Sequence, residues 1–73
     1  MDKTKYLLAK ANGLLDRFRG DEISRRIAKR YPLSAQIALL MDREEKKAEF
    51  AEYQAFREAV KAEVDAEIAN LEV

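Results

Sequence analysis

The 73-residue sequence contains no cysteine and no histidine, and it has only one proline and two glycines. Without cysteine the chain cannot form a disulfide or a thiolate metal site, and without histidine it lacks an imidazole base and a zinc-finger ligand. A chain this short rarely gains more than about 3–5 kcal/mol from its own core, and association with a partner is the remaining way to stabilise it. The composition therefore favours a homo-oligomer, a dimer or larger.

Long hydrophobic runs and strand patterns are also missing. The longest apolar run, residues 37–41, is too short to span a membrane, and Lys10 interrupts the apolar segment that a signal peptide would need. We therefore expect a cytoplasmic protein without a membrane span. The residues that dominate instead are Ala, Glu, Lys, Arg and Leu, which form helices well. The few β-branched residues never alternate with polar ones over the length of a strand.

Capping and breaking residues divide the chain into helices. Gly20 is suited to the C-terminus of a first helix, and Asp21 can cap a second. Pro32 disfavours helical geometry at the residue before it, and Ser34 can cap a third helix. The predicted single helical domain thus has helices at about residues 3–19, 21–31 and 34–72.

The third predicted helix is unusually long, because no Gly or Pro follows Ser34. Residues 42–47 are all charged, so a turn there is an alternative to a continuous helix. Each of them tolerates a helix, so we favour a continuous one. The predicted fold is all-α, a helical hairpin or small helical bundle with one long C-terminal helix.

Two apolar stripes run along this C-terminal segment, on nearly opposite sides of a helix. The stripe of large residues has a mean spacing of 3.5 residues, the period of a coiled-coil seam, and we expect it to meet the first helix or a second copy. The other stripe consists of alanines and would let a second backbone come close, unless the alanines are only good helix formers on a solvated surface. The predicted interface residues are Leu7, Leu14, Leu15 and Phe18 on the first helix and Phe50, Tyr53, Phe56, Val60, Val64, Ile68 and Leu71 on the large-residue stripe.

The sequence gives little support for catalysis. Its few hydroxyl groups have no histidine to activate them, its carboxylates fall on charged helix faces, and its two glycines are isolated rather than part of a phosphate-binding loop. We therefore expect no enzyme, and no catalytic, cofactor-binding or metal-binding residues.

Charge is unevenly distributed along the chain. Residues 1–31 hold nine Lys/Arg and four Asp/Glu, whereas residues 32–73 hold five and ten. The simpler interpretation is that the two halves pair with each other; the alternatives are a basic half that binds nucleic acid or a first helix that lies on a membrane surface. In the membrane interpretation, basic side chains flank a Leu/Phe face, which is more simply the core side of a bundle helix. Those basic residues are Lys3, Lys5, Lys10, Arg17 and Arg19.

The nucleic-acid alternative depends on residues 23–41, which resemble a helix-turn-helix in their small Ala28, apolar Leu33 and capping Ser34. Pro32 stands where that motif usually has glycine, and among the residues offered to the groove only the glutamine can read a base edge. The alternative function is therefore a small DNA-binding protein. Its contacts would be Arg25, Arg26, Lys29, Arg30 and Gln36.

The segment 26–56 also resembles helical stretches of small phage and prophage proteins encoded near tail genes. The resemblance implies a structural or virion-assembly role, a place in the phage particle, and no active site to transfer. Together with the apolar stripes, it leads us to expect a non-enzymatic structural or protein-interaction module that self-associates by helix packing. The resemblance depends on Arg26-Ile27, Tyr31-Pro32, Gln36-Ile37-x-x-Leu40 and Phe50-x-x-Tyr53-x-x-Phe56.

Overall fold

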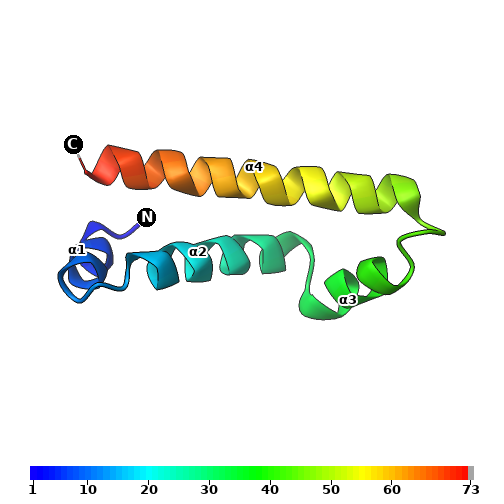
Figure 1. The fold of residues 1–73 in the computed structure, drawn as a ribbon, viewed down its shortest axis with the longest axis horizontal. Helices are drawn as coiled ribbons and strands as arrows, with labels where there is room; N and C mark the ends of the chain where they lie inside the picture. Colours follow the sequence, from blue (N-terminus) through cyan, green and yellow to red (C-terminus); the bar gives the residue numbers. More distant parts are fainter. Residues whose placement is uncertain (73) are drawn as a thin grey trace.

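A computed structural model describes residues 1–72, which form four helices and no strand. The long C-terminal helix α4 runs antiparallel to α2 along a rod with principal extents of 45 × 19 × 17 Å, and α3 follows α2 along the same side (Figure 1). Helix α1 lies at the opposite end of the rod from α3 (Figure 1). The prediction of an all-α helical bundle with a long C-terminal helix is confirmed. The helices are α1 (Lys3–Ala11), α2 (Leu15–Arg30), α3 (Leu33–Met41) and α4 (Lys47–Leu71).

The predicted first helix is wrong, because the chain turns at Gly13 rather than at Gly20. Gly13 has φ +70°, a left-handed conformation that glycine adopts without steric cost. Its N–H donates to the Lys10 carbonyl at 3.2 Å, and the Leu14 N–H donates to the Ala9 carbonyl at 2.7 Å. These two bonds form a Schellman motif, which satisfies the last carbonyls of α1. Gly20 lies within α2 instead.

The predicted continuous helix over 34–72 is also wrong, because the chain turns between Asp42 and Lys46. The Lys46 N–H donates to the Asp42 carbonyl at 2.9 Å, and α4 starts one residue later. The charged stretch holds no apolar side chain that needs burial, so a turn there loses little beyond a few helical hydrogen bonds. In return, the turn brings α4 back along α2, which a continuous helix would not allow. Ser34 also differs from its prediction, since α3 begins at Leu33 with Pro32 at the cap position.

The turn between α2 and α3 agrees with the prediction for Pro32. Tyr31 leaves the helix with φ −124° and ψ 91°, the extended geometry expected before proline. Pro32 is the N-cap residue of α3, where its missing N–H costs no helical hydrogen bond. No helix within residues 1–72 is both long enough and apolar enough to cross a bilayer.

The core lies between α2 and α4. Ile23 and Ile27 of α2 pack against Tyr53, Val60 and Val64 of α4, and all five side chains are buried. At about 1.5–3 kcal/mol for each fully buried large apolar side chain, this cluster is the main stabilising element of the fold. Partly buried residues surround it, namely Tyr31, Leu39, Phe50, Phe56 and Ile68.

Candidate interaction surfaces

The large-residue stripe of α4 is used within the chain. Tyr53, Val60 and Val64 are buried against α2, while Phe50, Phe56, Ile68 and Leu71 are half-buried. Of the residues predicted to face this stripe from the first helix, Leu7 and Leu14 are exposed, while Leu15 and Phe18 are half-buried and belong to α2. The buried residues of the stripe pack against Ile23 and Ile27 of α2.

Tyr6 anchors α1, and the sequence did not single it out. Its side chain is 1% exposed, its ring centroid lies 6.0 Å from that of Phe18, and its hydroxyl donates to Glu72 Oε1 at 2.8 Å. Burial, together with the neighbouring Glu72 carboxylate, raises the pKa of the Tyr6 phenol. Four consecutive apolar residues begin at Tyr6, and their spacing alone could not show which one would be buried.

A network of charges around Arg26 links α2 to α4. The Arg26 guanidinium donates to Glu22 within α2 at 2.9 Å, to Glu63 at 3.0 Å and to Glu67, whose Oε1 accepts at 3.0 Å. The Arg26 side chain is only 20% exposed, so its bonds are better shielded than those of an ordinary surface pair. Arg26 is therefore engaged in holding the two longest helices together.

A second ion pair joins the same two helices. Arg19 donates to both carboxylate oxygens of Asp65, at 2.5 and 3.1 Å. The hydrogen bond from Arg19 lowers the pKa of Asp65, and the hydrogen bond from Arg26 lowers that of Glu67. The basic half of the sequence thus pairs with the acidic half inside one chain, as the simpler interpretation of the charge pattern predicted.

The residues predicted to touch nucleic acid are largely occupied. Arg26 pairs with α4, Arg25 pairs with a glutamate of its own helix, and the Arg30 guanidinium lies 4.8 Å from the centroid of an aromatic ring of α4. Lys29 is exposed. Gln36, which was to read a base edge, is half-buried and donates to a backbone carbonyl. DNA binding stays a prediction, and the structure gives the three arginines and Gln36 other partners.

Gln36 connects three helical segments, a role that sequence reasoning missed. Its Nε2 donates to the Tyr31 carbonyl at 2.8 Å, and its Oε1 accepts from the Tyr53 hydroxyl at 2.6 Å. The rings of Tyr31 and Tyr53 pack edge to face with centroids 5.0 Å apart. These contacts set the position of α3 relative to the end of α2 and to α4.

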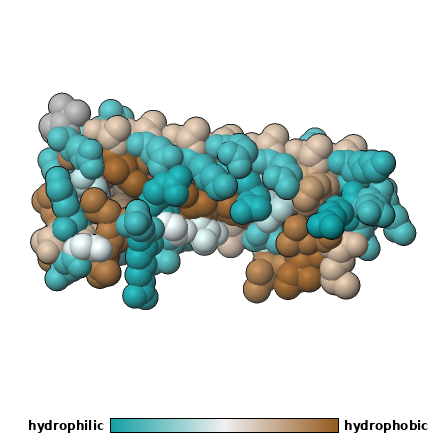
Figure 2. Space-filling model, viewed as in Figure 1, coloured by the Kyte–Doolittle hydropathy of each residue, from teal (hydrophilic) through white to brown (hydrophobic). Residues whose placement is uncertain are grey.

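Helix α3 turns much of its apolar surface to solvent. Leu33, Ile37, Leu40 and Met41 are 70, 48, 46 and 79% exposed, and hydrophobic atoms gather on the outer side of this end of the rod (Figure 2). We call these four residues the α3 face. Beside Leu33, a groove of about 310 Å³ opens between α2 and α3. Contiguous exposed apolar surface of this kind marks interaction sites more often than single exposed leucines do.

The alanine stripe of α4 is solvent-exposed along its whole length. No helix within residues 1–72 covers it, as expected for a face that points away from α2. Glu52, Glu58 and Glu63 lie next to it at helical spacing, so its rim is mainly acidic. The exposed residues are Ala48, Ala51, Ala55, Ala59, Ala62, Ala66 and Ala69.

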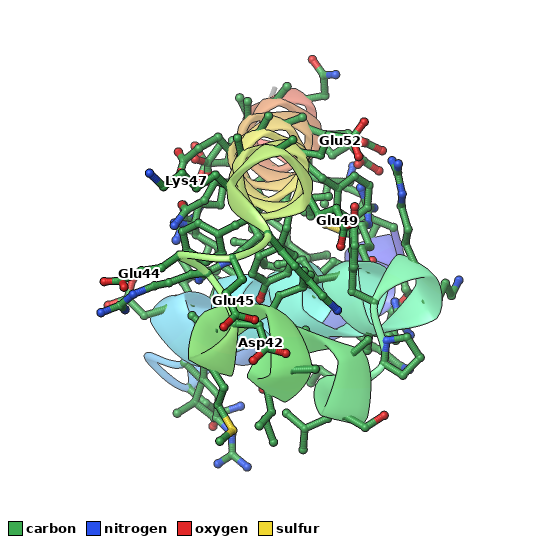
Figure 3. All side chains as sticks on the ribbon, turned by 90° about the vertical axis from the view of Figure 1, so that its right-hand side faces the viewer. Asp42, Glu44, Glu45, Lys47, Glu49 and Glu52 are labelled. Carbon is green, nitrogen blue, oxygen red and sulfur yellow. The ribbon has the colours of Figure 1, made fainter. Side chains whose placement is uncertain are left out.

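Charged residues gather at the turn between α3 and α4. Asp42 and Glu45 lie at the end of α3, and Lys47 lies on one flank of α4 opposite Glu49 and Glu52 (Figure 3). Within residues 1–72, the carboxylates do not cluster in a way that could hold a metal ion. The α3 face therefore ends at a turn of mixed charge.

Comparison with known proteins found no match among family models, curated proteins or solved structures.

Proposed function

We propose that this chain is a non-enzymatic structural module that self-associates, and that the α3 face is its contact surface. The observation that supports this most directly is the exposure of four large apolar side chains on one nine-residue helix. Within residues 1–72 only six hydrophobic residues are buried, so a single chain has a small core. Covering the α3 face would add apolar burial that the isolated chain lacks.

A second copy of the chain fits this face because the face carries no charge. Residues 31–41 contain no charged side chain, although charged residues make up 38% of the sequence. A twofold axis brings the same surface patch of both copies together, so any charge at the centre of the patch would face a like charge. The chain as a whole has a formal net charge of zero, so two copies also do not repel each other over longer distances.

The charges at the two ends of α3 favour an antiparallel pairing. Lys29 and Arg30 precede the helix, whereas the segment that follows it, residues 42–47, carries three acidic and three basic side chains. When two copies of α3 run in opposite directions, the basic end of each lies against the charge-balanced turn of the other, whereas a parallel pairing would bring the two basic ends together. Avoiding the contact between like charges selects the antiparallel orientation.

Antiparallel pairing also provides an occupant for the groove beside Leu33. It places Met41 of one copy near Leu33 of the second copy, next to the groove between α2 and α3. Methionine is unbranched and adapts to irregular apolar spaces. The most exposed side chain of the α3 face would then become one of its best packed.

The test is the solution mass of the purified chain, measured by light scattering over a range of concentrations. We expect a dimer for the natural sequence and a monomer for Ile37→Glu, which puts a charge at the centre of the face. Ala55→Glu, on the exposed alanine stripe, is the matched control and should remain dimeric. Because both positions are exposed helical sites, circular dichroism should show unchanged helicity in both variants.

Two results would overturn the proposal. A monomer at all concentrations would remove self-association altogether. Dissociation by Ala55→Glu but not by Ile37→Glu would move the contact to the alanine stripe. A role in the assembly of a phage particle agrees with such a module, and it is supported by the sequence resemblance of residues 26–56.

A further inference from the structure

The end of the rod opposite α3, formed by α1, carries a second exposed apolar surface. On α1 and in the turn after it, Leu7, Leu8 and Leu14 are 51, 60 and 46% exposed. At 100° per residue, Leu7, Leu8 and Ala11 share the side of α1 that faces away from buried Tyr6. No other helix within residues 1–72 covers them.

This surface is bordered by positive charge that forms no ion pair among the described residues. Lys3 and Lys10 lie on one flank of the leucines at helical spacing, and Lys5 lies on the other. Within residues 1–72, none of the three lysines forms an ion pair, whereas four arginines of α2 do. Helix α1 itself contains no acidic residue.

We propose that α1 and the turn after it bind the surface of an anionic lipid bilayer, with the leucines entering the headgroup region. Leucines bordered by lysines are typical of helices that lie in the plane of a membrane surface. The long lysine side chains can bury their methylene stems beside the leucines and keep their ammonium groups at the phosphates.

The combination of leucine and lysine favours lipid over the other polyanions. A nucleic acid would engage the lysines through its phosphates and leave three large apolar side chains in water. An acidic protein would need a groove shaped to this projecting end, whereas the headgroup region adapts to it. This site is independent of the α3 face, since the two surfaces lie at opposite ends of the rod (Figure 1).

The experiment is co-sedimentation of the full chain with vesicles of phosphatidylcholine, with and without phosphatidylserine. We expect binding only when phosphatidylserine is present, and binding that weakens as salt is added. Replacing Lys3, Lys5 and Lys10 together with glutamine should weaken binding by roughly fivefold per lysine. Replacing Leu7 and Leu8 with glutamine should also abolish most of the vesicle binding, since electrostatic attraction alone would remain.

The matched control is a triple glutamine variant at Lys29, Lys46 and Lys47, which removes the same charge from exposed positions away from α1. It should bind vesicles like the natural sequence. Ile37→Glu separates this proposal from self-association, because a monomer should still bind, although more weakly through the loss of a second contact point.

Three outcomes would overturn the proposal. The first is no binding to phosphatidylserine vesicles at low salt. The second is equal loss of binding in the control triple variant, which would indicate attraction by overall charge. The third is retention on duplex DNA that depends on the three α1 lysines but not on the leucines, which would identify a nucleic acid as the ligand.

Discussion

Replacing each of the two glycines with alanine should change stability in opposite directions. Gly20 lies inside α2, and a Cβ built there meets no atom within 4 Å. Alanine at a helical position with free space should stabilise the fold by about 1 kcal/mol, because glycine loses more backbone entropy on folding. For a domain of this size the melting temperature should rise by about 4–8 °C.

Gly13 offers the same open space but a different backbone. A Cβ there also meets nothing within 4 Å, yet φ is +70°. The left-handed conformation costs an L-residue about 1–2 kcal/mol, which exceeds the entropy that alanine removes from the unfolded chain. Gly13→Ala should therefore destabilise the fold by about 1 kcal/mol.

Thermal unfolding followed by circular dichroism compares the two variants with the natural sequence. All three should be measured at one chain concentration, since self-association would make the melting temperature depend on concentration. A lower melting temperature for Gly20→Ala would refute the assignment of Gly20 to the interior of α2. It would place the helix end where the sequence first suggested.

Two further predictions concern the contacts that hold α4 in place. Tyr53→Phe removes the hydroxyl that donates to Gln36 and should cost about 1 kcal/mol, seen as a lower midpoint in urea; an unchanged midpoint would contradict the role of Gln36. The pKa values of Glu67 and Asp65 are lowered by their arginine partners, so the stability they contribute is present above the ordinary carboxylate pKa and is lost as the pH falls through the lowered values. Unfolding in urea across acidic pH should show this loss, and Glu67→Gln should reduce the pH dependence.

Sequence patterns predicted the residue classes that pack, but not always their neighbours. The mean spacing of 3.5 residues identified the stripe through Tyr53, Val60 and Val64, which is buried. Its partner was expected to be the first helix or a second copy, whereas Ile23 and Ile27 of the predicted second helix pack against its buried residues. Periodicity shows that a face needs burial, and it contains no information about which other face covers it.

The errors in helix boundaries have a common physical origin. Gly13 and Gly20 are both followed by residues that tolerate helix, and only tertiary contacts determine which one adopts the left-handed conformation. The stretch between Asp42 and Lys46 likewise tolerates both helix and turn, with little difference in local free energy. Packing of α4 on α2 determines the outcome, and that contact spans residues far apart in the sequence.

The candidate surfaces were only partly foreseeable. The alanine stripe and the basic first helix were recognised from spacing. The exposure of Ile37 and Leu40 was not, because an apolar segment is ordinarily expected to be buried. Gln36 hydrogen-bonds with both Tyr31 and Tyr53, so the side of α3 that carries Gln36 faces inward. Ile37 and Leu40 are therefore left on the outside.

The two long sides of the rod differ in mechanical character. One side is the single helix α4, whose 25 residues have an unbroken hydrogen-bond ladder, whereas the other side is jointed at Pro32 (Figure 1). Bending should therefore concentrate at Pro32, because the continuous helix α4 resists it. Helix α3 can then change its angle with loss of the few contacts around Gln36 and Leu39, while the α2–α4 core stays intact. A surface placed beyond such a joint can adjust its angle to whatever it binds without the rest of the molecule having to refold.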